Sequence, residues 1–294
     1  MKFLFLLLYL TVSYSCINSQ EKGYVNYFYE TNKAALNILK SDYDAALTVY
    51  KSVFKSYPHS FYRDVHNACV CAIKLNKTGE AFEFAQMMVL HGYELFDFDK
   101  EPFVYLKNNK KQWRKFTNAY PKYRDKYIET VDRELRERYY ALSLNDNLAV
   151  EYRLDKTIKE QDSLLYNLSV QLTELIEKNG FPNWMMNKDT MSFKLTVMLR
   201  HYHGVKNRIE RDEELQNDAL YASMSFDRLH SMVEDAFSKG LMLPDAYEVI
   251  TTYWLRKNPY GVTTVKIDYD AEKVTPFLLL SPEEVVEANK NREV

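Results

Sequence analysis

Glycine and proline are scarce in this chain, and that scarcity limits the folds it can adopt. Only 7 Gly and 8 Pro are spread over 294 residues. Tight hairpin turns rely on such residues, so a fold built from many short strands would need more of them. Apolar residues make up 46% of the chain, which is enough for a full hydrophobic core. We therefore expect a mainly α fold with long helices.

The N-terminus has the pattern of a secretory signal. In Met1–Thr11 a single Lys precedes an apolar run of about ten residues. A transmembrane helix needs a longer run, of about 20 residues. Ser13 and Ser15 are small residues at alternate positions, which suits cleavage after Ser15. We expect residues 1–15 to be a signal peptide and the chain to be exported. The location would be periplasmic or attached to the outer membrane, with an extracellular one also open.

The next residue, Cys16, leaves two fates open. In a bacterial lipoprotein the Cys that follows a short apolar run is acylated, but Ser13 stands where Leu is usual. Lipidation of Cys16 and ordinary cleavage are both compatible with the sequence. We expect residues 16–23 to be a linker, and any membrane contact to be made only through lipid on Cys16.

Residues 24–95 show helical spacing in four segments: Tyr24–Lys40, Asp42–Tyr57, Phe61–Leu75 and Gly79–His91. The second segment carries Ala46, Tyr50, Val53 and Pro58 at the spacing of a tetratricopeptide repeat (TPR) helix. The region resembles two degenerate TPR-like hairpins. Such hairpins cannot bury their faces alone, so we expect them to dock on the C-terminal part of the chain.

Residues 96–145 are expected to be connecting helices. Pro121 suits the first turn of a helix that runs to about Leu142, and Asn145–Asn147 suits a break after it. One long helix, Leu148–Lys178, would come next and end at Gly180.

The remainder, residues 146–294, is expected to be a helical domain with one small terminal β-hairpin and a final helix. Its other helices are expected at Asp189–Tyr202, Phe226–Lys239, Pro244–Leu255 and from Ser281 onward. Residues 262–269 alternate with a period of two and can pair with Val274–Leu280. The expected fold is therefore mainly α, with TPR-like helical hairpins packed on a helical C-terminal domain.

The order of short motifs in this second half resembles a bacterial domain family of unknown function. The matching positions are Asp146, Arg153, Asp162, Asn167, Gly180, Pro182, His201 or His203, Tyr260, Gly261, Pro276, Asn289 and Arg292. The resemblance implies a shared architecture and carries no activity with it.

The stretch from Arg200 to Gly204 holds two histidines, His201 and His203. Imidazole titrates near neutral pH and is a frequent catalytic base. Two positions apart on a helix, the two rings face different directions, unless Gly204 ends the helix and frees His203. His203 and His201, with Tyr260 and Asp162, are the candidate catalytic residues. The alternative is one packed and one capping histidine.

Carboxylates around the start of the expected long helix form a second group. Asp146 suits an N-cap. Arg153 and Asp162 can form a buried ion pair or line a polar cleft, so Asp146 and Arg153 are candidate binding residues.

Residues 107–127 contain eight basic side chains and only one acid, Asp125, interleaved with aromatic residues. Lys110, Lys111 and Arg114 are the candidate binding residues of this segment. Such a segment can bind polyanions. It can also be a solvated face whose aromatics form a core stripe.

Two cysteines of the mature chain, Cys69 and Cys71, lie two positions apart, where sulfurs on a helix cannot meet. We expect two small buried residues. No Cys-x-x-Cys or His-Glu-x-x-His spacing and no glycine-rich phosphate loop occurs, so we expect no metal and no cofactor.

With no complete catalytic motif, the expected function is a protein-binding or scaffolding component of the bacterial cell envelope. A partner protein is expected, and nucleic acid is not. The alternatives are an enzyme with a His203-centred polar pocket and a purely structural envelope protein.

Overall fold

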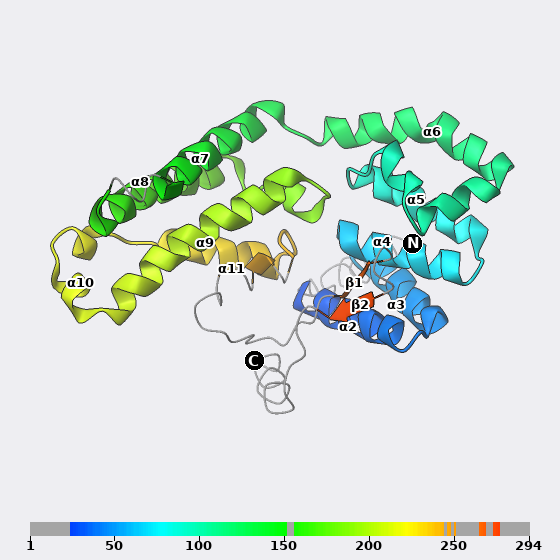
Figure 1. Ribbon diagram of the computed structural model, residues 1–294, viewed down its shortest axis with the longest axis horizontal. Coiled ribbons are helices and arrows are strands. Elements are labelled where there is room, and N and C mark those ends of the chain that lie inside the picture. Colours follow the sequence, from blue (N-terminus) through cyan, green and yellow to red (C-terminus); the bar gives the residue numbers. More distant parts are fainter. Residues whose placement is uncertain are drawn as a thin grey trace, which may run out of the picture.

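The computed structural model describes residues 24–151, 156–243, 246, 247, 250, 265–268 and 273–276. This part of the chain is mainly helical and forms two helical groups (Figure 1). The first group consists of α2 (Tyr24–Leu39), α3 (Tyr43–Ser56), α4 (Tyr62–Lys74), α5 (Thr78–Leu90), the short 3-10 helices η1 (Leu95–Asp99) and η2 (Phe103–Asn108), and α6 (Lys110–Glu129).

The second group consists of α7 (Arg133–Glu151), α8 (Ile158–Asn179), η4 (Asn183–Met186), α9 (Thr190–Arg211), α10 (Glu213–Asn217), η5 (Tyr221–Ser223) and α11 (Asp227–Ser238). Strands β1 (Val265–Asp268) and β2 (Lys273–Pro276) pair antiparallel, with Val265 opposite Pro276. The other residues expected in the β-hairpin lie outside the described part, so the full hairpin stays a prediction. The expected Pro244–Leu255 and C-terminal helices also lie largely or wholly outside it.

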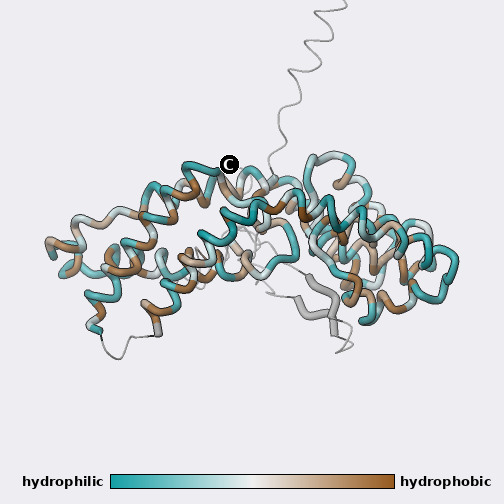
Figure 2. Tube along the Cα trace, turned by 90° about the horizontal axis from the view of Figure 1, so that it is seen from above, coloured by the Kyte–Doolittle hydropathy of each residue, from teal (hydrophilic) through white to brown (hydrophobic). Residues whose placement is uncertain are grey.

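Helices α2 to α5 form two consecutive hairpins, as expected from the helical periodicity of residues 24–95. Asp42 caps α3 by accepting a hydrogen bond from the Ala45 amide at 3.1 Å. Asn76 turns the chain between α4 and α5 with a positive φ of 56°. Hydrophobic and hydrophilic residues alternate along the helices (Figure 2), which gives each helix one face to bury.

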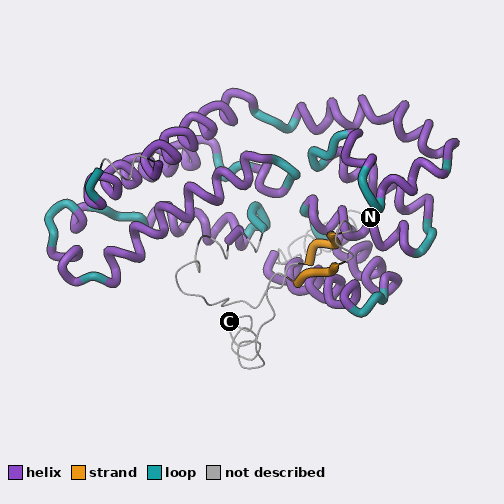
Figure 3. Tube along the Cα trace, viewed as in Figure 1, coloured by secondary structure: helices purple, strands orange, loops and turns teal. Residues whose placement is uncertain are grey.

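Several expected helix boundaries are wrong, most of them between residues 96 and 157; in addition, α9 continues to Arg211 instead of ending at Tyr202. Helix α6 continues through Pro121. The chain breaks instead at residues 130–132, which form the loop between α6 and α7 (Figure 3). There Asp132 accepts a hydrogen bond from the Leu135 amide at 2.9 Å and so starts α7. The aromatic side chains on both sides of Pro121 pack toward the same neighbours, and this packing outweighs the lost backbone hydrogen bond.

Helix α7 also runs through Asn145–Asn147, where a break was expected. The long helix expected from Leu148 begins instead at Ile158, behind a capping box in which Thr157 and Glu160 each accept from the other's backbone amide. Its end is as expected. Gly180 follows α8 with a positive φ of 80°.

The hydrophobic core of the second group extends into the first. Tyr24, Tyr27 and Phe28 of α2 belong to the same buried cluster as residues of α7 to α11. The Phe28 ring stacks on Phe237 of α11 with centroids 5.1 Å apart. The first helical hairpin therefore docks on the C-terminal helices, as expected from its unpaired apolar face.

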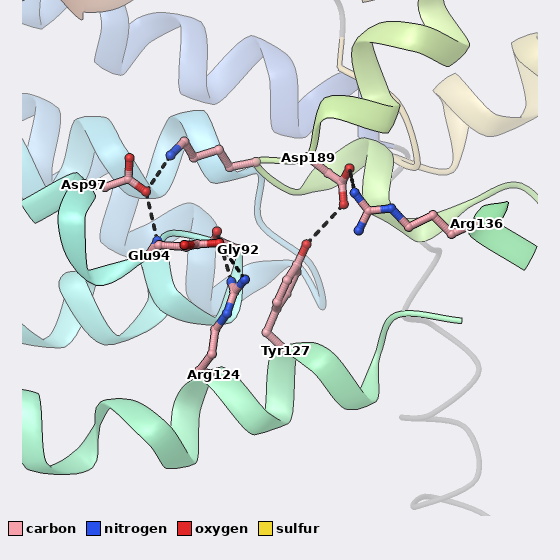
Figure 4. Close-up of polar contacts among 8 residues, drawn as sticks. Gly92, Glu94, Asp97, Arg124, Tyr127, Arg136 and Asp189 are labelled. Carbon is pink, nitrogen blue, oxygen red and sulfur yellow. Dashed lines mark hydrogen bonds and ion pairs between the residues drawn. The ribbon is translucent and has the colours of Figure 1, made fainter. Parts of the chain in front are cut away.

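A polar network fixes the start of α9 to both helical groups (Figure 4). Asp189, which is almost fully buried, caps α9 by accepting from the Met191 amide at 2.8 Å. The same carboxylate accepts from Arg136 of α7 at 2.8 Å and from the hydroxyl of Tyr127 of α6 at 3.3 Å. One side chain thus ties three helices together.

The adjoining contacts of this network involve the chain after α5. Arg124 donates to the Gly92 carbonyl at 3.2 Å and to Glu94 at 2.9 Å (Figure 4). The ammonium of Lys188 lies 2.5 Å from the buried carboxylate of Asp97. Of these contacts, the ion pair between Lys188 and Asp97 joins the two helical groups, while Arg124 fixes α6 within the first group.

Candidate functional site

Helices α7 and α9 lie side by side and run in the same direction. Arg136 pairs with Asp189 near the start of the two helices, and Asp146 pairs with His201 about three turns later. The difference in residue number between the partners is nearly constant, 53 and then 55. The two helices therefore stay parallel along a continuous seam.

A buried carboxylate–imidazole pair occupies this seam. Asp146 is completely buried, and its Oδ2 lies 2.8 Å from Nδ1 of His201, whose side chain is 17% exposed. Asp146 is therefore not the expected N-cap, because α7 continues past it and turns it toward α9. Such a carboxylate holds an imidazole in one orientation, as in catalytic dyads, and it also serves as a structural tie.

Large apolar side chains are exposed on α7 and α9, and those of α7 lie on the face turned away from Asp146. Tyr140, Leu144 and Leu148 follow one another at intervals of four residues on the outer face of α7, and each is more than 40% exposed. Phe193 of α9 is 73% exposed, and its neighbour Lys194 places its ammonium 5.1 Å from the centroid of the Tyr140 ring. We call these four apolar residues the α7–α9 strip. It is about 12 Å long on α7 alone.

Asp162 lies in a second buried cluster. Its carboxylate accepts two hydrogen bonds from Nη1 of Arg208, at 3.0 and 2.8 Å, and one from the Tyr221 hydroxyl at 3.0 Å. The expected partner Arg153 lies outside the described residues, and Arg208 of α9 pairs with Asp162 instead.

Burial raises the pKa of Asp162, against the lowering effects of Arg208 and Tyr221. The folded chain therefore holds this proton more tightly than the unfolded chain. The contribution of this carboxyl to the free energy of unfolding therefore rises as the pH falls from its pKa in the folded chain toward its ordinary pKa of 3.8.

His203 lines a different, open pocket between α9 and α11. The polar lining residues are His203, Lys206 and His230, and the rest of the lining is apolar, with Leu199, Tyr202, Phe226, Leu229, Val233 and Ile250. The rings of His203 and His230 stack with centroids 5.6 Å apart. His201 and His203 thus face different surroundings, as helical geometry predicts. Gly204 does not end the helix, because α9 continues to Arg211.

The expected neighbours of His203 are not all brought to it. Asp162 already binds Arg208 and Tyr221, and Tyr260 lies outside the described residues. Within the described ranges no group of three or more His, Cys, Asp or Glu side chains can hold a metal ion. Of the predicted residues that the structure describes, neither His201 nor Asp162 lines the His203 pocket.

The basic segment forms the exposed face of α6. Asn109 caps this helix by accepting from the Gln112 amide at 3.1 Å, which places Lys110, Lys111 and Arg114 in its first turns. All three are exposed, whereas Phe116 and Tyr127 are buried on the other side of the helix.

Cys69 and Cys71 are both buried and free, as expected. Burial raises the pKa of the Cys71 thiol to about 12 and raises that of Cys69 still further. Both are unreactive core residues. Cys16 lies outside the described part of the chain.

Sequence reasoning missed several partners that complete these clusters. Arg208, Tyr221 and His230 come from helices whose packing no local pattern reveals. The α7–α9 strip was also missed, although Tyr140, Leu144 and Leu148 recur at helical spacing. Its signal was hidden because α7 carries apolar residues on its buried face as well.

Among the helices that the structure describes, none is both long and apolar enough to cross a bilayer. Comparison with known proteins gives no family: no protein-family model, no curated protein and no solved structure matches the chain.

Proposed function

We propose that the chain is an exported helical scaffold of the bacterial cell envelope that binds a protein partner through the α7–α9 strip. The observation that carries this proposal is the exposure of Tyr140, Leu144 and Leu148 at intervals of four residues on one face of α7, with Phe193 also exposed on the parallel helix α9. Exposed apolar side chains that gather in one place mark interaction surfaces more often than single ones do.

The spacing on α7 suits the partner's chemistry. Apolar residues four positions apart on a rigid helix match the apolar face of another amphipathic helix, which packs its own residues between them. The seam behind the strip is held by the buried pair of Asp146 and His201, so the strip is rigid before the partner arrives. Export is supported by the N-terminal sequence alone.

The helical hairpins form the other part of the proposed scaffold, beside the C-terminal helices. We propose that residues 24–95 are degenerate TPR-like hairpins that pack on the C-terminal domain, and that a small β-hairpin is added to that body. Consecutive antiparallel helices and the stacking of Phe28 on Phe237 support this arrangement.

The test is the double substitution Leu144→Glu with Leu148→Glu in the full chain, followed by affinity purification from the native envelope. Both side chains are exposed, so the fold should be retained. We expect the loss of a defined partner that the wild-type chain retains. A matched control is Leu36→Glu on α2, because Leu36 and Leu144 have the same exposed fraction, 43%. Unchanged partners in the double variant would contradict the proposal and leave a purely structural role.

An enzyme centred on His203 is the second candidate. It is favoured by the pocket that gathers His203, Lys206 and His230 over an apolar lining. The test is His203→Ala, which should leave the thermal midpoint nearly unchanged but abolish the cellular phenotype. A large loss of stability would instead assign His203 to packing on His230.

A further inference from the structure

The exposed face of α6 concentrates positive charge on one side of a helix about 30 Å long. Its cations are Lys110, Lys111, Arg114, Lys115, Lys122 and Lys126, all exposed. At 100° per residue these positions fall within one half of the helix circumference. Two exposed acids of α6, Asp125 and Glu129, fall on the same half, so the face carries six positive and two negative charges in a chain whose net charge is −2.

The aromatic residues of α6 take the opposite side of the helix. Phe116 packs on Phe82 of α5 with centroids 5.9 Å apart, and the Tyr123 hydroxyl donates to Gln86 at 3.0 Å. Tyr127 is buried against the start of α9. Packing therefore holds the helix firmly with its basic face turned outward.

Within the described part of the chain, the cations of this basic face lack ion-pair partners. None of its six cations forms an ion pair within the described part of the chain, whereas Arg124, on the inner side of α6, pairs with Glu94. Like charges also recur four positions apart, as in Lys111 with Lys115 and Lys122 with Lys126, and such pairs destabilise a helix. A face kept only for solubility would balance the two signs of charge more evenly than six cations against two acids.

We infer that this face of α6 docks on an anionic phospholipid bilayer. Six cations on one half of a firmly packed helix at one edge of the molecule (Figure 1) can face a planar anionic surface together. Single-stranded nucleic acids instead require exposed rings on which bases stack, and here the rings face the protein. This contact would add to any lipid on Cys16 and is independent of the α7–α9 strip.

The experiment is co-sedimentation of the full chain with vesicles of phosphatidylcholine, with and without phosphatidylglycerol. The two kinds of vesicle differ in surface charge, so the difference in binding between them measures the electrostatic contact. Each cation at such a surface contributes about fivefold to binding. The triple substitution Lys111→Gln, Lys115→Gln and Lys122→Gln should therefore lower binding to the anionic vesicles about a hundredfold.

The control is a triple substitution of exposed lysines elsewhere, Lys40→Gln, Lys55→Gln and Lys100→Gln, which changes the net charge equally. We expect it to bind as the wild type does, and wild-type binding to weaken as salt is raised to about 0.15 M. Equal binding by both triple variants would overturn the inference. Tighter binding to heparin or single-stranded DNA than to the anionic vesicles would also overturn it, by assigning the face to a soluble polyanion.

Discussion

Gly240 is the position at which one added methyl group should separate the two helical groups. It follows α11 with a positive φ of 71°, and a Cβ there would lie 2.0 Å from Cγ of Tyr24. The Tyr24 ring cannot simply turn away, because it is packed against Tyr57 at 5.4 Å and its hydroxyl accepts from the His59 amide at 2.9 Å. The Gly240→Ala substitution must therefore displace the start of α2.

The expected loss in the free energy of unfolding of Gly240→Ala has two parts. A left-handed conformation costs a non-glycine residue about 1–2 kcal/mol. Complete loss of a buried aromatic side chain costs about 3–5 kcal/mol, and a displaced Tyr24 loses part of that. Together they should lower the free energy of unfolding by about 3 kcal/mol in Gly240→Ala.

A double-mutant cycle measured by urea unfolding separates the two parts. In the Tyr24→Ala background the ring is gone, so Gly240→Ala should cost only its backbone part, about 1–2 kcal/mol. Gly180→Ala is the matched control. It has a positive φ of 80°, but its Cβ would meet nothing within 4 Å, so its cost should be the same with and without Tyr24. Additive costs for Gly240→Ala and Tyr24→Ala would refute the docking of α2 on α11.

Three further predictions concern the buried polar groups and thiols. Arg208→Met should lower the free energy of unfolding by about 3 kcal/mol at neutral pH, since it leaves the buried Asp162 carboxylate without its cation. Because the pKa of Asp162 is already raised, this loss should shrink as the pH falls toward 4, and an equal loss in urea unfolding at pH 7 and at pH 4 would refute the assignment. Asp189→Ala should cost about 2–4 kcal/mol, since it removes a helix cap and leaves Arg136 without its acid; a cost below about 0.5 kcal/mol would show that it does not tie the helices together. Cys69 and Cys71 should resist a thiol reagent at neutral pH in the folded chain and react on unfolding, and fast reaction before unfolding would contradict their burial.

Helix ends that rest on local chemistry could be predicted from the sequence. Gly180 after α8 and Gly240 after α11 both take the positive φ that glycine adopts readily. The turn between α4 and α5 likewise follows from Asn76. At these places the local preference and the tertiary structure agree.

Helix starts between residues 96 and 157 could not be predicted as well, because packing overrides the local signals there. Pro121 removes one backbone hydrogen bond, but the aromatic residues on either side of it hold α6 in one piece. Asp146 resembles a helix N-cap in the sequence, yet its carboxylate pairs with the imidazole of His201, which is 55 residues away. The capping box at Thr157 and Glu160 was a readable signal that marks the true start of α8.

The candidate site was only partly readable for a related reason. The different surroundings of His201 and His203 follow from helical geometry, but their partners Asp146 and His230 come from other helices. Helix α7 has apolar residues on two faces, and only the packing shows that Tyr139 is buried while Tyr140 is exposed.

The most direct test of partner binding is photo-crosslinking in cells from a crosslinking amino acid placed at Leu144, with the same residue at Leu36 for comparison. Both positions are equally exposed, so they sample solvent and chance neighbours alike. We predict one discrete crosslinked protein from position 144, which disappears when Leu148→Glu is added, and none of that protein from position 36. Crosslinks from position 36 alone, or from neither position, would contradict a partner site on α7 and α9.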